Sequence, residues 1–188
     1  KILNPMFMSQ KMRVLKLTIP SLRVKFFIVV IMATKLFALE LAEVFSFSCI
    51  HCYNAEPQVQ SFSQNKQVKF VPIPLYDQTD INEVAVINAY FAAVSLGKQW
   101  QFRKYYYDAV FTYGLPVYSK EALAYTLTKC EFNNKAFYAL ASSAKVRVQV
   151  QYAVDLAIKY NVTSTPTFIV NGVNYFEGEN AIQEIMAN

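Results

Sequence analysis

Residues 44–53 read Val44-Phe45-Ser46-Phe47-Ser48-Cys49-Ile50-His51-Cys52-Tyr53, an apolar run that ends in a Cys-x-x-Cys motif. Two cysteines separated by two residues can close a disulfide across one helical turn, and the helix N-terminus behind them often makes the first one reactive. His51 is the only histidine of the chain. A structural zinc site needs four ligands, and only Cys130 supplies another sulfur. We therefore expect no metal.

The length and composition of the chain indicate a folded protein with a substantial core. It has 188 residues, of which 54% are hydrophobic and 15% aromatic. The net charge of +5 is unevenly distributed, because residues 1–38 hold seven Lys and Arg and no acid. Residues 39–188 hold eleven Lys and Arg against thirteen Asp and Glu, a net charge of −2. This nearly neutral part has no electrostatic footprint for nucleic acid, and we expect no nucleic-acid partner.

Residues 1–38 have the layout of a secretory signal peptide. A basic lead precedes the apolar run 26–33, and small residues follow at Ala33 and Ala38. This run is shorter than the roughly 20 residues that a membrane-spanning helix needs. The alternative is a strand of the mature fold, since Val, Ile and Phe also favour strands. We favour a signal peptide or basic apolar leader, and export would place the cysteines where disulfides persist.

The Cys-x-x-Cys motif lies between two predicted strands. Residues 39–47 are dense in Leu, Val and Phe, as in a strand buried on both faces. A helix is predicted over 50–63, and Pro57 should kink it because proline removes a backbone hydrogen bond. The second strand, 68–75, is stopped by prolines that cannot donate to a ladder.

A block of helices is predicted to follow. Asp80 and Glu83 have the spacing of a capping box, and the helical pattern continues until Gly97 offers a stop. Further helices are predicted at 99–111, at 120–129 with Ser119 as its cap, and at 135–160 with Asn134 as its cap; the last is long enough to break.

The sequence pattern at the end of the chain predicts a β-hairpin and a short helix. Strands 167–170 and 173–176 flank Asn171-Gly172, the turn that a two-residue loop prefers, and a helix then runs to Met186. The order of elements fits an α/β thioredoxin fold with an inserted all-helical subdomain. The first half of that fold would be 39–79, the helical insertion 80–145 and the second half 146–188.

Two segments resemble the DsbA family of bacterial thiol:disulfide oxidoreductases. Residues 43–53, followed by Glu56-Pro57, are similar to its active-site segment, and residues 163–172 (Thr-Ser-Thr-Pro-Thr-Phe-Ile-Val-Asn-Gly) are similar to its cis-proline segment and hairpin. The likeness covers roughly 39 to 186. Cys-x-x-Cys alone is a weak signal, but this combination is specific.

The chemistry of such a site depends on thiolate stability. A free thiol with a pKa of ~8.5 is only about 3% thiolate at pH 7, and only the thiolate attacks a disulfide. The helix N-terminus and a protonated His51 would stabilise a Cys49 thiolate, and a stable thiolate makes the disulfide form the better oxidant. We therefore expect Cys49 to be the attacked sulfur, with Cys52 as its buried partner.

The resemblance implies further features. Thr165-Pro166 would be a cis peptide against the cysteine pair, presenting backbone groups to an extended substrate. Glu43 matches the buried strand acid of the family, where it would relay a proton; alternatively it is solvated at the strand end. The expected protein is periplasmic, needs no cofactor beyond the Cys49-Cys52 disulfide, oxidises reduced or unfolded exported proteins, and is reoxidised by a DsbB-like membrane partner.

Three residues depart from the family pattern and keep alternatives open. Ile50 stands where proline is common, Pro72 stands where a lysine accompanies the buried acid, and Thr165 is closer to isomerase and reductase relatives. The favoured function is disulfide donation, with a disulfide isomerase or reductase of the same fold as the alternative. A different class is a peptide-binding module or chaperone in which the cysteines form a structural disulfide. Cys130 is expected to be a buried apolar residue, not a third redox group.

Overall fold

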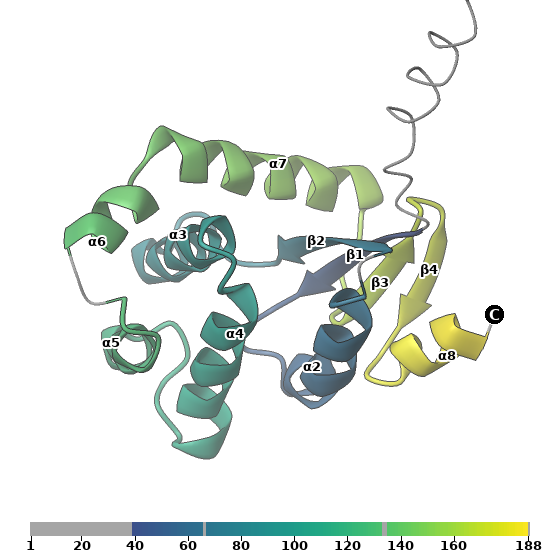
Figure 1. Ribbon diagram of the computed structural model, residues 1–188, viewed down its shortest axis with the longest axis horizontal. Coiled ribbons are helices and arrows are strands. Elements are labelled where there is room, and N and C mark those ends of the chain that lie inside the picture. The colour runs from purple at the N-terminus through teal and green to yellow at the C-terminus, as the bar shows by residue number, and fades with distance from the viewer. Residues whose placement is uncertain (1–38, 66, 133–134, 188) are drawn as a thin grey trace, which may run out of the picture. The chain divides into compact units, whose positions relative to one another are not determined.

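A computed structural model describes residues 39–65, 67–132 and 135–187 (Figure 1). The expected signal peptide and the predicted cap Asn134 lie outside these ranges. Four strands form one mixed sheet in the order β2-β1-β3-β4. β1 pairs in parallel with β2 and antiparallel with β3, and β4 pairs antiparallel with β3. The strands are β1 (Leu39–Phe45), β2 (Val68–Pro74), β3 (Thr167–Val170) and β4 (Asn174–Glu177).

Helices cover both faces of the sheet. α2 (Ile50–Ser63) and α8 (Ala181–Ala187) cover one face, and α7 (Ala144–Tyr160) covers the other (Figure 1). Successive residues of β1 pack against the helices on opposite faces of the sheet, because side chains along a strand point alternately to the two faces. Leu41 packs with α2 and α8, whereas Val44 packs with Tyr160 of α7. This layered α/β arrangement, with helices inserted between β2 and α7, is the predicted fold.

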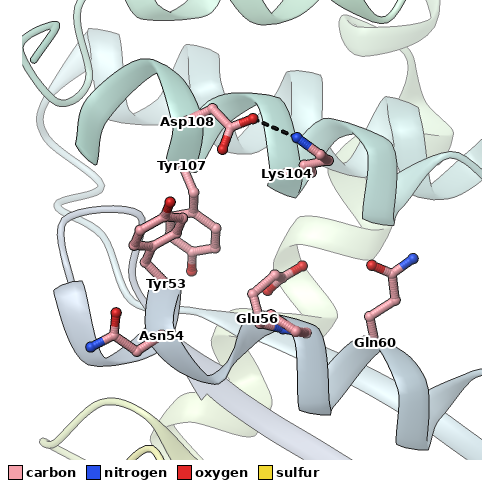
Figure 2. Close-up of a pocket in the computed structure, with 8 residues that line it drawn as sticks. Tyr53, Asn54, Glu56, Gln60, Lys104, Tyr107 and Asp108 are labelled. Carbon is pink, nitrogen blue, oxygen red and sulfur yellow. Dashed lines mark hydrogen bonds and ion pairs between the residues drawn. The ribbon is translucent and has the colours of Figure 1, made fainter. Parts of the chain in front are cut away.

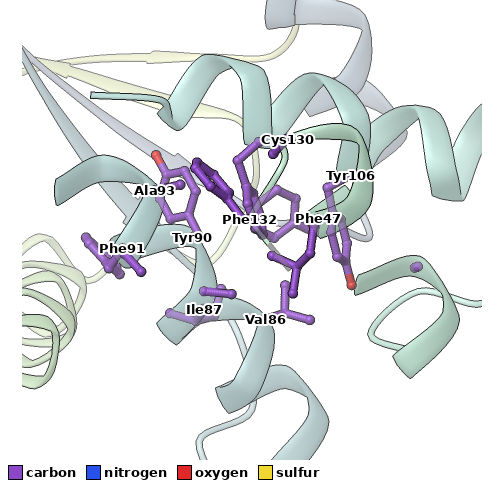
Figure 3. Close-up of a cluster of buried hydrophobic side chains, with 14 of the residues drawn as sticks. Phe47, Val86, Ile87, Tyr90, Phe91, Ala93, Tyr106, Cys130 and Phe132 are labelled. Atoms are coloured by element: carbon purple, nitrogen blue, oxygen red, sulfur yellow. The ribbon is translucent and has the colours of Figure 1, made fainter. Parts of the chain in front are cut away.

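The inserted helices surround a cluster of aromatic side chains. They are α3 (Ile81–Ser95), α4 (Gln99–Tyr107), α5 (Lys120–Lys129) and α6 (Lys135–Ala141). The ring of Phe47, from the loop after β1, contacts those of Tyr90 at 5.7 Å and Tyr106 at 4.6 Å between centroids (Figure 3). Such pairs contribute about 0.5–1.5 kcal/mol each beyond area burial. The loop that leads from β1 to Cys49 is thus anchored in the insertion.

The predicted caps of the insertion are largely present. The Asp80 side chain accepts hydrogen bonds from the amides of Asn82 and Glu83, and Ser119 accepts one from Ala122. The capping box is not reciprocal, since Glu83 accepts from the amide of Asp77 at 2.8 Å. Gly97 (φ 69°) ends α3 as predicted, in the left-handed conformation that glycine adopts without strain.

Two predicted helices have different boundaries in the structure. The helix expected at 99–111 is α-helical only to Tyr107 and continues as a π-helical turn, Asp108–Thr112, in which the Tyr113 amide bonds to the Asp108 carbonyl. The wider turn brings Phe111 against Tyr53, with their ring centroids 5.3 Å apart. The helix expected at 135–160 does break, and Ser143 caps its second part, α7.

The remaining elements follow the prediction closely. α2 continues through Pro57 to Ser63. In the hairpin, Asn171 (φ 52°) and Gly172 (φ 74°) form the turn, but β4 begins at Asn174, one residue later than predicted, and Val173 stays in the loop. Of the helices in the described ranges, none combines the length and the apolar character needed to cross a bilayer.

Candidate active site

Cys49 is the N-cap of α2. Its backbone is extended (φ −94°, ψ 113°), and its Sγ accepts a hydrogen bond from the Cys52 amide at 3.2 Å. Amides in the first turn of a helix have no partner within the helix, and the helix dipole favours negative charge at this end. Cys49 thus lies at the helix N-terminus, where the sequence places it; its function as the attacked sulfur stays a prediction.

Cys52 lies on the inner side of the motif. Its side chain is fully buried, whereas Cys49 is half-buried, and both thiols are free in the structure. Burial raises the pKa of the Cys52 thiol far above its usual value, and the negative charge of Glu43 raises it further. The two sulfurs thus differ strongly, with an accessible Cys49 and a buried Cys52 that resists ionisation.

The Thr165-Pro166 segment lies against Cys49. The peptide bond is cis, as predicted. The Cys49 thiol donates a hydrogen bond to the Thr165 carbonyl at 3.3 Å, and the Pro166 carbonyl accepts one from the Gly178 amide at 2.9 Å. Cys49 and Thr165, which are 116 positions apart in the sequence, are therefore in contact through the Cys49 sulfur. Substrate binding by Thr165 and Pro166 stays a prediction.

His51 points away from the core and is bound by a residue that the sequence did not reveal. Its side chain is 62% exposed, and Nδ1 lies 3.1 Å from Oε2 of Glu179. The same oxygen accepts a hydrogen bond from Asn54 at 3.0 Å. The hydrogen bonds from Asn54 and His51 lower the pKa of Glu179. Ile50, the other residue between the cysteines, is 44% exposed.

Glu43 is part of a buried ionic cluster. It is fully buried, so the alternative of a solvated carboxylate is wrong. Its two oxygens accept hydrogen bonds from Nη1 and Nη2 of Arg103 in α4, at 2.6 and 2.9 Å. Pro72 stands where the family pattern has a lysine beside the buried acid, and in this chain Arg103 supplies that positive charge instead. Arg103 is buried on α4 together with Phe102 and Tyr106. A single charged residue among buried aromatic residues of a helix is the signal that the sequence analysis overlooked.

Glu56, on α2, completes this cluster. Its Oε2 lies 2.8 Å from Nε and 2.6 Å from Nη2 of Arg103. Burial raises the pKa of Glu56 to about 7. The positive charge of Arg103 lowers this pKa, and the negative charge of Glu43 raises it. The same two carboxylates hold the pKa of Arg103 well above its usual value although burial opposes this. Arg103 therefore keeps its charge.

A cavity of about 450 Å³ lies beside this cluster, between α2 and α4 (Figure 2). The Glu56 side chain extends from α2 towards α4, and Lys104 forms an ion pair with Asp108 at 2.6 Å on the opposite wall. The residues that line it include Tyr53, Asn54, Glu56, Gln60, Lys104 and Tyr107.

Cys130 takes no part in this site. It is fully buried in the aromatic cluster, as expected, and burial raises its pKa to about 11 (Figure 3). Within the described ranges, no three His, Cys, Asp or Glu side chains are grouped so that they could hold a metal ion.

Comparison with known proteins shows the family. Residues 40–186 match the family model described as DSBA-like thioredoxin domain. The chain belongs to this family. Among curated relatives, the thiol:disulfide interchange protein DsbA of Pseudomonas aeruginosa is 26% identical over 141 residues, which are 74% of this chain and 66% of the relative. DsbA of Azotobacter vinelandii is 25% identical, over 74% of this chain and 65% of its own length. The chain thus spans slightly less than two thirds of these relatives.

Solved structures show the same DsbA-like fold. The oxidoreductase DsbA from Xylella fastidiosa has a TM-score of 0.65 at 24% identity, covering 79% of this chain and 82% of its own. DsbA from Pseudomonas aeruginosa also has a TM-score of 0.65, at 22% identity, covering 79% and 80%. The thioredoxin fold with a helical insertion and the resemblance to the DsbA family are therefore confirmed.

Proposed function

We propose that the chain is a thiol:disulfide oxidoreductase that donates its Cys49-Cys52 disulfide to reduced proteins. The observation that supports this best is the asymmetry of the cysteine pair. Cys49 Sγ caps the helix and contacts the Thr165 carbonyl, whereas Cys52 is buried with a raised pKa. Such a pair presents one sulfur to a substrate and protects the other.

The proposed reaction has two exchange steps. A substrate thiolate attacks Sγ of Cys49 in the disulfide form, the Cys49–Cys52 bond breaks, and Cys52 leaves with the electron pair. A second substrate thiolate then attacks the substrate sulfur of the mixed disulfide, and Cys49 leaves as a thiolate, which the helix N-terminus stabilises. The substrate loses two electrons as its disulfide forms, and the cysteine pair gains them.

The cellular setting is proposed from the relatives. The DsbA relatives support export to the periplasm, reduced or unfolded exported proteins as substrates and a DsbB-like membrane partner that restores the Cys49-Cys52 disulfide. The redox-active disulfide is the only redox group that the proposed reaction needs. Thr165 and Pro166 would align the substrate by strand addition next to Cys49.

The redox equilibrium of the Cys49/Cys52 pair against glutathione tests this proposal. For a donor we expect a pair that is more oxidising than the glutathione couple, and rapid oxidation of a reduced model protein. A strongly reducing pair would contradict donation and identify a reductase, and efficient reshuffling of a scrambled protein with poor oxidation would identify an isomerase. If Cys49→Ala keeps full function and peptide affinity, the chain is a binding module with a structural disulfide.

A further inference from the structure

Ser46 closes the turn that leads into Cys49. The Cys49 amide donates a hydrogen bond to the Ser46 carbonyl at 3.2 Å, and the Ser48 amide donates one to Oγ of Ser46 at 3.2 Å. The Ser48 hydroxyl lies 2.8 Å from the same Oγ. Cys49 is both the last residue of this turn and the N-cap of α2, so the turn sets where the Cys49 sulfur lies relative to the amides of the helix.

Tyr118 reaches this turn from the loop before α5. Its hydroxyl lies 3.2 Å from Oγ of Ser46, across 72 positions of the chain. Burial raises the pKa of this phenol, and hydrogen bonds with Ser46, with the Phe47 backbone and with Ser48 oppose the rise. A single hydroxyl group from the inserted helices therefore interacts with three successive residues of the turn.

The backbone of Tyr118 is unusual for a bulky residue. Its φ is 57°, in the left-handed region that side chains other than those of asparagine and aspartate rarely adopt. Asn161 and Asn171 are also left-handed, but they are of the type that tolerates this conformation. Strained backbones persist only where their surroundings hold them, and they are concentrated at functional sites. A tyrosine at this position therefore points to a role of its side chain.

Neighbouring residues hold Tyr118 in place. Its amide donates a hydrogen bond to the Tyr106 hydroxyl at 3.1 Å. The Tyr106 ring in turn packs against that of Phe47, with the ring centroids 4.6 Å apart (Figure 3). The next residue, Ser119, caps α5. Tyr118 is thus anchored to both α4 and α5, and this anchoring holds its hydroxyl at the turn.

We propose that Tyr118 is a positioning residue for the cysteine pair, and that its hydroxyl restrains the turn at Ser46 so that the Cys49 sulfur keeps its place at the N-terminus of α2. This inference rests on the proposed function, because it concerns the sulfur that a substrate would attack. In this position Sγ of Cys49 accepts a hydrogen bond from the Cys52 amide at 3.2 Å. A less restrained turn would stabilise the Cys49 thiolate less well and make the pair a weaker oxidant.

The effect of this hydroxyl should be moderate, because the turn has a second restraint from the insertion. The Tyr107 hydroxyl donates a hydrogen bond to the Ser46 carbonyl at 3.4 Å. The turn therefore stays closed when the Tyr118 hydroxyl is removed, and only part of the free energy of one hydrogen bond is transmitted to the sulfur.

The variant Tyr118→Phe tests this role, because it keeps the ring and removes only the hydroxyl. We expect the equilibrium constant of the cysteine pair against glutathione to shift about two- to fivefold towards the weaker oxidant. Iodoacetamide should alkylate Cys49 of the reduced protein more slowly by a similar factor at pH 7. Tyr113→Phe is the matched control, since it removes from the same loop a hydroxyl that bonds to Tyr125 and should leave both values unchanged.

Ser46→Ala tests the same contact from its other side. This variant should shift both values in the same direction, and adding Tyr118→Phe to it should cause little further change. Unchanged values in Tyr118→Phe, or an equal shift in Tyr113→Phe, would overturn the proposal. Should Tyr118→Phe not fold, unchanged values in Ser46→Ala would overturn it instead. If the unmodified protein fails to oxidise a reduced model protein, the proposed function is wrong, and the alkylation rates still decide the role of Tyr118.

Discussion

Oε2 of Glu179 lies 3.1 Å from Nδ1 of His51, so one of the two residues between the cysteines is bound to the turn before α8. The same turn bonds to the Pro166 carbonyl through Gly178. A single short segment therefore contacts both the active-site helix and the cis-proline segment.

Glu179→Gln is expected to make the cysteine pair a stronger oxidant. The substitution removes the negative charge that contacts His51, which lies between the two cysteines, and a less negative surrounding favours the thiolate and hence the reduced form. The equilibrium constant against glutathione should shift by about two- to fivefold, the range of a partly screened surface charge, and the shift should shrink at high salt. Asp155→Asn removes the same charge from the exposed face of α7 and should leave the constant unchanged. A shift towards the reductant would contradict this account.

Arg103→Met should destabilise the fold severely. It leaves Glu43 and Glu56 buried without their shared cation, a change that costs about 3–5 kcal/mol. Lys104→Met, at the next position, removes the exposed pair with Asp108 and a contact with the Tyr105 ring, and it should cost about 1 kcal/mol or less. Urea unfolding measures both. Arg103→Lys should give an intermediate loss, because lysine keeps the charge but not the fork of donors. Equal stability of the two Met variants would show that the cluster contributes nothing.

The stability of the folded chain should fall between about pH 4.5 and pH 7 because of Glu56. Its pKa is raised from 4.5 to about 7 on folding, so the native state holds a proton that the unfolded state has lost. The contribution of Glu56 to the free energy of unfolding is on the order of 3 kcal/mol. It is complete below pH 4.5 and is lost as the pH rises through 7. Comparing urea unfolding of the unmodified chain and Glu56→Gln across this range isolates it. A parallel pH dependence of the two proteins would rule it out.

The two active-site cysteines should differ sharply in alkylation. In Cys52→Ser the remaining Cys49 is half-buried at the helix N-terminus, and it should react readily with iodoacetamide at pH 7. In Cys49→Ser, Cys52 is buried with a strongly raised pKa and should react more than about tenfold more slowly. Mass spectrometry gives both rates. Cys130 is buried in both variants and serves as an internal reference.

The sequence predicted the elements whose signals are local. Asp80, Ser119 and Gly97 mark helix ends through side-chain and backbone chemistry within a few residues, and the structure has these ends. The cis bond at Pro166 was predicted from the resemblance to the family. The π-helical turn after Tyr107 was missed, because it brings Phe111 to Tyr53, a residue almost sixty positions away.

The sequence predicted the two cysteines of the candidate site, together with His51 and Glu43, but it did not predict the charged partners of His51 and Glu43. Glu43 was singled out, but its partners Arg103 and Glu56 come from two other elements, and only the fold brings them together. Glu179 likewise reaches His51 across 128 positions of the chain. Charge pairs at such separations have no periodic signature along the sequence. A lone arginine among aromatic residues on one helical face is the only available indication.

Pro72 and Pro74 lie in β2, an outer strand of the described sheet. Proline has no amide hydrogen, so this border lacks donors that a foreign strand would need for a continuous ladder. The proposed substrates are unfolded chains with many unpaired strand-forming segments. A protein that works among them is exposed to unwanted sheet extension, and these two prolines make the β2 edge a poor template for aggregation.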